Sequence, residues 1–220
     1  MIVAAFKALG DVLSPEFRSI LLKAIGLTLG LFVAVLILTE FLISTLSLLP
    51  WPWAETILAI GTGVVLVVAF FFLMAPAAAI FAGLFLDQVA AIVEAKHYPN
   101  DPPGASLSTA QSVVTALQFA AVVLVVNLAL LPMIFFAIGA FVLVVANAYL
   151  ISREYFEMAA MRHMPVAEAR RLRKDNTPQI FLAGFLPAVL SLVPILNLVV
   201  PLFATSYFTH LFRKVRVSSA

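Results

Sequence analysis

Long apolar stretches separated by short polar segments are the main pattern along this chain. Residues 1–23 are amphipathic, and large apolar residues recur there at helical spacing, at Phe6, Leu9, Leu13, Phe17 and Ile20. A helix with one apolar face typically lies in the membrane interface. Ser14 and Pro15 interrupt this pattern, and because serine favours the cap and proline the first helical position, a second helix is predicted to start there.

The apolar stretch between Glu55 and Asp87 contains no charged residue and is longer than one bilayer crossing needs. We expect it to cross once, with a bend near Pro76, where proline removes a backbone donor. A first apolar run, 24–49, precedes it and carries only one charge, at Glu40. Residues 24–97 are therefore predicted to form two transmembrane helices, against which the rest of the chain is arranged.

Two later apolar stretches predict helical hairpins. Residues 107–151 lack charge and are interrupted only around Asn127, while residues 179–212 are broken by three prolines into halves of about 15 residues. Such a half spans about 22 Å as a helix, which is less than the bilayer's hydrocarbon thickness of about 30 Å. We expect the second hairpin to enter the bilayer only partly. The first is assigned the same form, although a spanning arrangement stays open.

Composition and charge indicate a single membrane domain over residues 1–220. The chain is 64% hydrophobic and 11% charged, whereas soluble domains carry about 25% charged residues. If both hairpins return to their side of entry, all thirteen Lys and Arg lie on one side, including those of a polar segment at 152–178. The positive-inside rule makes that side cytoplasmic, together with both termini.

The chain offers little for metal, thiol or nucleic-acid chemistry. It has no cysteine, and its net charge of +2 is too small to indicate nucleic-acid binding. His97, His163 and His210 are scattered without metal-ligand spacing, so we predict no metal and no cofactor. Zinc-protease, serine-hydrolase and paired intramembrane aspartate motifs are missing from the sequence, which argues against an enzyme.

Several polar residues lie where apolar sequence meets polar sequence and are candidates for a pore or gate: Arg153, Glu154, Glu157, Asp87 and Asn127. Ionisable residues inside a membrane are functional candidates by default. The alternatives are an ion pair at the membrane boundary for Arg153 with its acids, a basic partner for Asp87, and a turn cap for Asn127.

Three features together resemble the CysZ family of bacterial inner-membrane sulfate permeases. They are the Ser-Pro-Glu-Phe-Arg element from Ser14, the G-L-F-L-D-Q-V sequence at the end of the second predicted transmembrane helix, and the R-E-Y-F-E motif from Arg153 to Glu157, flanked by the proline-broken hairpins. The resemblance covers most of the chain. It implies two long transmembrane helices, two partly penetrating hairpins, a homo-oligomer and uptake of sulfate for cysteine synthesis.

The resemblance also implies a sulfate-binding site formed by Phe17, Arg18 and Ser19. In the family this site is associated with a Gly-Leu-Arg element at the start of the first long helix. Here Glu16 stands at the glycine position, and Ser19 stands where a second basic residue is often found. Free N–H groups at a helix start and an arginine fork suit a tetrahedral oxyanion. The alternative is that Arg18 reaches lipid phosphate.

Two functions from different classes follow. The first is a sulfate permease or channel, with sulfite as a further possible substrate. Because the chain has no nucleotide-binding loop, transport is expected to be passive or coupled to an ion gradient. Two spans cannot easily enclose a pore, so this reading needs a homo-oligomer in contact with membrane lipid. The second is a membrane scaffold that transports nothing.

Overall fold

The computed structural model describes residues 1–46, 61, 85–106, 109–130, 132–133, 139–197 and 199–219. All regular structure within these residues is helical, which confirms the predicted all-α class. The helices are α1 (Ile2–Val12), α2 (Pro15–Leu46), a helix over 85–97, α4 (Thr109–Leu130), α5 (Gly139–Met161), α6 (Val166–Asp175), α7 (Thr177–Leu190), α8 (Pro194–Asn197) and α9 (Val200–Ser219).

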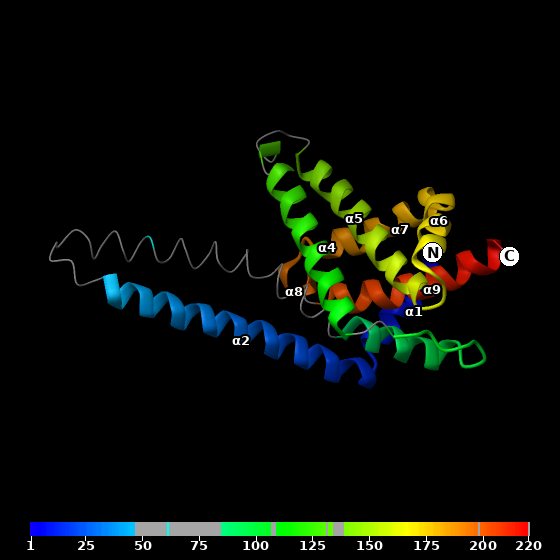
Figure 1. Ribbon diagram of the computed structural model, residues 1–220, viewed down its shortest axis with the longest axis horizontal. Helices are drawn as coiled ribbons and strands as arrows, with labels where there is room; N and C mark the ends of the chain where they lie inside the picture. The colour runs from blue at the N-terminus through cyan, green and yellow to red at the C-terminus, as the bar shows by residue number, and fades with distance from the viewer. Residues whose placement is uncertain are drawn as a thin grey trace.

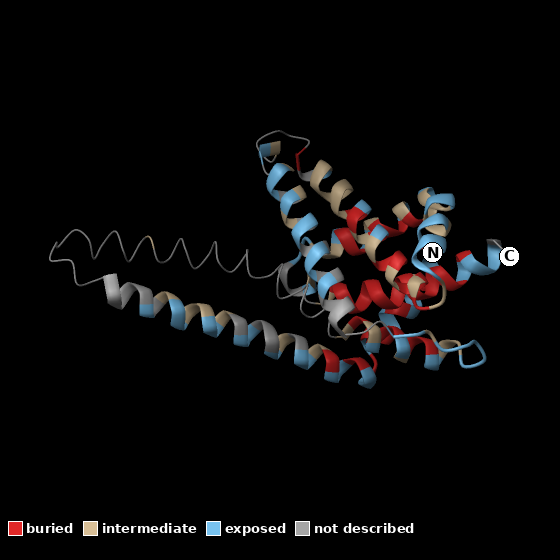
Figure 2. Cartoon of the chain, in the orientation of Figure 1, coloured by how far each residue is buried: buried red, intermediate tan, exposed pale blue. Residues whose placement is uncertain are grey.

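Helix α9 forms the centre of the packed part of the molecule (Figures 1 and 2). It contacts α1, α5 and α7, and residues 200–213 are buried on every side. Phe208 and Phe212 are one turn apart and therefore share a face of α9. Their rings meet Tyr155 and Phe156 of α5 at centroid distances of 6.4 and 6.1 Å. This aromatic contact fixes α5, which carries Arg153, Glu154 and Glu157 and ends next to Arg162.

Helices α5 and α7 approach closely because of Gly184. A Cβ atom at this position would overlap the backbone oxygen of Ala148 and lie 2.8 Å from the Cβ of Ser152. Glycine is thus required for this contact, since no other residue leaves the space empty.

Helix α1 is amphipathic as predicted, but it buries its small residues. Ala4 and Ala8 pack inward, while Phe6 and Leu9 are exposed, Phe6 to 71%. The predicted apolar stripe does not continue from α1 into α2 as one exposed face. Its residues on α1 are exposed, whereas Phe17 and Ile20 of α2 are fully buried. The exposed stripe on α1 consists of Ile2, Phe6, Leu9 and Leu13.

The second predicted transmembrane helix, including Pro76, lies almost wholly outside the described residues. Helix α2 begins at Pro15, next to the predicted start at Ser14, and extends away from the packed part over 32 residues (Figure 1). Taken over the described residues, no helix has the combined length and apolar character that a bilayer crossing requires. The two transmembrane helices stay a prediction.

The proline-rich stretch 179–212 breaks at fewer places than its prolines suggested. Helix α7 continues through Pro187, and Pro201 is the second residue of α9, where a missing N–H is tolerated. The chain changes direction only between Leu190 and Val200, around the short helix α8. The expectation of a break at each proline was therefore wrong. The depth to which this pair of helices, or the pair α4 and α5, enters a bilayer stays a prediction.

Candidate functional site

The predicted sulfate-binding residues lie at the start of α2 and differ in exposure. The Phe17 side chain is fully buried, and its backbone N–H donates to the Ser14 carbonyl oxygen at 3.2 Å. Arg18 and Ser19 are exposed, and the Ser19 hydroxyl donates to the Glu16 carbonyl oxygen at 3.4 Å. Phe17 therefore anchors the helix start, while the side chains of Arg18 and Ser19 lie on the surface of the molecule.

The Ser14 side chain does not cap α2. Its hydroxyl is buried and has no hydrogen-bond partner among the described residues. The positive end of the helix is instead met by Glu16 in the first turn. Lys96, from the helix over 85–97, lies 4.0 Å from the Glu16 carboxylate and adds a cation that the sequence did not place here.

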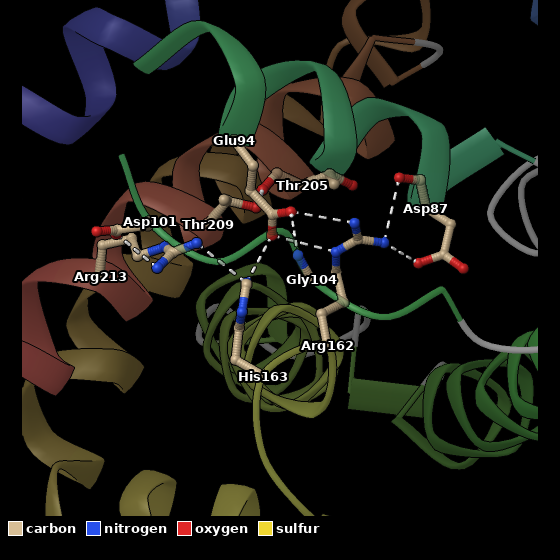
Figure 3. Close-up of polar contacts among 9 residues, drawn as sticks. All are labelled: Asp87, Glu94, Asp101, Gly104, Arg162, His163, Thr205, Thr209 and Arg213. Carbon is tan, nitrogen blue, oxygen red and sulfur yellow. Dashed lines mark hydrogen bonds and ion pairs between the residues drawn. The ribbon is translucent and has the colours of Figure 1, made fainter. Parts of the chain in front are cut away.

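A buried polar cluster forms where the helix over 85–97 meets the end of α5 (Figure 3). Arg162 donates two hydrogen bonds to the Glu94 carboxylate, from Nε at 3.2 Å and from Nη2 at 3.1 Å. Its Nη1 donates to a carboxylate oxygen of Asp87 and, at 3.3 Å, to the backbone oxygen of Asp87. We call Asp87, Glu94, Gly104, Arg162 and His163 the Arg162 cluster.

The Glu94 carboxylate accepts two further bonds within the Arg162 cluster. The Gly104 backbone N–H donates at 3.1 Å, and His163 Nε2 lies 2.8 Å away. The Arg162 side chain is only 4% exposed, so this arginine needs its two acids to offset its lost hydration. Burial lowers the pKa of Arg162, but the bonds and charges of Glu94 and Asp87 outweigh it and raise the pKa above its usual value. The cluster thus holds a permanent ion pair network.

His163 joins the Arg162 cluster to α9. Its ring stacks on Phe212 at 5.5 Å, and its Nε2 is 3.2 Å from Nη2 of Arg213. Nη1 of Arg213 donates to Asp101 Oδ2 at 2.6 Å. Burial is the largest influence and lowers the pKa of His163, despite the neighbouring Glu94. The neutral ring is therefore favoured, and its Nε2–H donates to Glu94, because that contact is the shorter one and ends on a carboxylate.

A second polar cluster joins α5 to α6. The buried Glu157 accepts a bond from Arg173 Nε at 2.6 Å, and Arg170 and Arg153 lie 3.7 and 4.0 Å from its carboxylate. These four residues are called the Glu157 cluster. The basic residues of α6, which in the sequence indicated topology, also fix this helix to α5.

Glu154, on the same helix as Glu157, has a pKa well above the usual value for a glutamate. Burial is the main cause, and the negative charge of Glu157 adds to it, while Arg153 and Arg170 act in the opposite direction. The net effect raises the pKa of Glu154 to about 7. This side chain can therefore gain or lose a proton under physiological conditions.

The residues predicted as a pore or gate are divided between these clusters. Asp87 pairs with Arg162, whereas Glu157 pairs with Arg173, so the two acids bind different arginines. Asn127 lies in α4, and its side chain is not among those described. Their shared role as a gate stays a prediction.

A third cluster surrounds Asp11, a buried residue of α1. His97 Nε2 lies 2.7 Å from its Oδ1, and the Ser206 hydroxyl donates to its Oδ2 at 2.7 Å. His210 Nε2 lies 3.2 Å from Oδ2, and the Tyr98 hydroxyl lies 2.7 Å from His210 Nδ1. We call these five residues the Asp11 cluster.

Asp11 stays ionised although it is 1% exposed. Burial raises its pKa, but the hydrogen bonds from His210, His97 and Ser206 together outweigh burial and hold the pKa far below its usual value. Sequence spacing could not reveal this site, because its members come from three distant segments. The available signal was weak: Asp11 follows Ala4 and Ala8 on the small-residue face of α1.

Comparison with known proteins identifies the family. The family model described as Sulfate transporter CysZ/Etoposide-induced protein 2.4 matches residues 4–201, which is most of the chain. The search of curated proteins returned no match. The match includes the start of α2, the Arg162 and Glu157 clusters and the R-E-Y-F-E motif from Arg153. The chain belongs to the family of Sulfate transporter CysZ/Etoposide-induced protein 2.4.

Proposed function

We propose that this protein is a sulfate permease or channel of the bacterial inner membrane and that it supplies sulfate for cysteine synthesis. The observation that carries the proposal is the family match over residues 4–201. The transport role is that of a carrier or channel and not of an enzyme.

Exposed apolar surface supports a place in the membrane. The stripe on α1 is joined by exposed Leu22, Ile37 and Phe41 along α2. Large apolar side chains that follow one another along two successive helices are typical of a surface covered by lipid or by another chain. This surface suits a helix α1 that lies in the interface and a helix α2 that enters the hydrocarbon.

The distribution of basic residues supports a cytoplasmic position for both termini. The Met1 amino group lies beside Lys214 near the end of α9, so the two ends of the chain are neighbours. Helix α6 carries Arg170, Arg171, Arg173 and Lys174. Because cytoplasmic segments are rich in Lys and Arg, this orientation follows the positive-inside rule.

Sulfate is proposed to bind at the start of α2. Arg18 is exposed in the first turns of a 32-residue helix, where its guanidinium and the positive helix end act on the same anion. Ser19 presents a hydroxyl beside it, and the buried Phe17 holds the helix start in place. Lys96 adds positive charge near Glu16.

Passage across the membrane is proposed to need a homo-oligomer, because two crossings of one chain cannot enclose a pore. Arg153, Glu154, Glu157, Asp87 and Asn127 are the polar residues proposed for the pathway. Sulfite, which resembles sulfate in charge and in its oxygen donors, is proposed as a competing substrate.

The test compares radiolabelled sulfate uptake into proteoliposomes that contain the wild-type protein, Arg18→Ala or Arg171→Ala. Arg171 is a matched control, since it is an arginine with an 86% exposed side chain whose i+4 pairing with Asp175 lies at the surface. A charge-assisted bond contributes about 1.5–3 kcal/mol, so Arg18→Ala should lower apparent sulfate affinity about tenfold or more. Arg171→Ala should match the wild type.

Equal uptake by all three proteins would move the sulfate site away from α2 and leave the transport function standing. If the folded wild-type protein gives no uptake above empty liposomes, the transport proposal fails and the scaffold reading replaces it.

A further inference from the structure

Two of the three histidines in the chain aim their Nε2 atoms at one carboxylate. His97 and His210 reach the two oxygens of Asp11 at 2.7 and 3.2 Å, and their ring centroids are 4.7 Å apart. The three ligand atoms lie within 4.8 Å of one another. Asp11 and His210 are buried, and the His97 side chain is 21% exposed. Such convergence of two imidazoles and a carboxylate is the ligand chemistry of a divalent transition ion.

The spacing fits a tetrahedral zinc ion after small side-chain movements. Zinc binds histidine nitrogen and carboxylate oxygen at about 2.0–2.2 Å, which places neighbouring tetrahedral ligands about 3.3 Å apart. The two observed nitrogen-to-oxygen distances, 2.7 Å from His97 to Oδ1 and 3.2 Å from His210 to Oδ2, end on different oxygens of the Asp11 carboxylate and lie below that spacing. The carboxylate must therefore turn one oxygen toward the ion, and the His97 imidazole must withdraw by about half an ångström. Three protein ligands leave a fourth position for water.

Ser206 and Tyr98 form hydrogen bonds that would hold the proposed metal ligands in position. The Ser206 hydroxyl donates to Asp11 Oδ2 and fixes the carboxylate, and Tyr98 lies 2.7 Å from His210 Nδ1. When zinc holds Nε2, the proton of a neutral imidazole sits on Nδ1 and needs an acceptor. The Tyr98 oxygen can serve as that acceptor by turning its own proton away. Metal binding thus requires a change of tautomer and no new protein contact.

Nearby positive charges repel a bound cation, but none of them is fixed in direct contact with the proposed metal position. Lys96 Nζ is 3.5 Å from Asp11 Oδ1, but its side chain is 41% exposed and can turn outward. Lys7 and Arg213 lie over the Tyr98 ring at 5.8 and 5.3 Å. The charge of Lys7 also acts directly on His210. Neither side chain contacts the Asp11 carboxylate in the described contacts.

We propose that Asp11, His97 and His210 form a zinc site that fastens α1 to α9 and to the end of the helix over 85–97. The three ligands come from these three elements, so one ion would close a loop of nearly the whole chain. Its ligands differ from the residues proposed to bind sulfate, although Lys96 lies between the two sites, 3.5 Å from Asp11 and 4.0 Å from Glu16. Its test does not require sulfate transport.

Metal binding is measured directly on the full chain, purified in detergent and freed of metal by a chelator. Zn²⁺ is titrated by calorimetry and its content measured after removal of excess ion. Co²⁺ is used as a substitute whose visible absorption distinguishes tetrahedral from octahedral coordination. The wild type is expected to hold one Zn²⁺ per chain, to give the intense tetrahedral Co²⁺ bands, and to unfold at a higher temperature with Zn²⁺ than without.

Histidine variants separate this site from chance binding. His97→Gln removes the most exposed ligand and disturbs packing least. It should weaken Zn²⁺ binding at least about a hundredfold, because even changes outside the ligand set weaken metal binding ten- to a hundredfold. His163→Gln is the matched control, since His163 is the one histidine outside the Asp11 cluster. It should keep one Zn²⁺ per chain.

Three results would overturn the proposal: a wild-type protein that retains no Zn²⁺, undiminished binding by His97→Gln, or weak octahedral Co²⁺ bands. Asp11→Asn gives a second check that keeps the side-chain shape. It should abolish the rise in unfolding temperature caused by Zn²⁺, and an unchanged rise would contradict the assignment.

Discussion

Single side chains in this molecule acquire their properties from contacts that cross between helices. Glu154 and Glu157 lie three residues apart on α5, yet Arg173 neutralises only Glu157. Glu154 is left with burial and with the charge of its neighbour, which raise its pKa to about 7. A carboxyl group that titrates near neutrality makes the stability of this region depend on pH.

The folded state favours protonated Glu154, because the pKa rises from its model-peptide value of 4.5 to about 7 on folding. Its stabilising contribution is therefore complete below about pH 4.5 and is lost as the pH rises through 7. Glu154→Gln removes this dependence. The variant should gain stability relative to the wild type as the pH rises from 5 to 8, by at most about 3 kcal/mol.

Thermal unfolding in detergent at pH 5 and pH 8 measures this difference. Glu168→Gln serves as the control, because Glu168 is an exposed acid on the neighbouring helix α6. A gain that is the same at both pH values, or that also occurs in Glu168→Gln, would contradict the raised pKa of Glu154.

Local spacing predicts some of these contacts and not others. The ion pair of Arg153 with Glu157 was visible in the sequence, because residues four apart share a helix face. The Arg162 cluster was not visible, since Arg162 and Glu94 are 68 residues apart and meet only when α5 and the helix over 85–97 pack together. The Asp11 cluster was missed for the same reason, and its histidines were therefore judged to be scattered.

Helices in this protein pack according to the size of the residues at their contacts. Hydrophobic pattern predicted that α1 and α2 are separate helices meeting near Ser14, and that the regions of α4 and α5 are helical. It did not predict which face of α1 is buried. Small Ala4 and Ala8 lie against the packed part and the large apolar residues face outward, which is the reverse of a soluble amphipathic helix.

The contact between α5 and α7 gives a prediction at this scale. Gly184→Ala should force the two helices apart, because the added methyl group overlaps the backbone oxygen of Ala148, which cannot move aside as a flexible side chain could. Overpacking of this kind destabilises a protein by about 1–3 kcal/mol. The unfolding temperature should fall accordingly.

Gly10→Ala is the control for this substitution. Gly10 is helical and exposed in α1, and a Cβ there would have no atom within 4 Å. Alanine should leave stability unchanged or raise it by up to about 1 kcal/mol through helix propensity. If Gly184→Ala is as stable as Gly10→Ala, the close approach of α5 and α7 is wrong.

The whole molecule combines a packed group of helices around α9 with one long helix, α2, that extends from it (Figure 1). The sequence predicted the all-α class and the family, because the R-E-Y-F-E motif and the helix start at Ser14 are local features. It did not identify α9 as the central helix. The residues of α9 looked like half of a membrane hairpin, and burial by α1, α5 and α7 depends on contacts across the chain.

Sulfate uptake by the reconstituted wild-type protein decides whether this protein is a transporter. Proteoliposomes with the protein, empty liposomes and liposomes with an unrelated membrane protein are given radiolabelled sulfate, with and without excess unlabelled sulfate or sulfite. We expect saturable uptake in the first preparation alone, and both unlabelled anions should reduce it. Folded, correctly reconstituted protein whose uptake equals that of empty liposomes would contradict it.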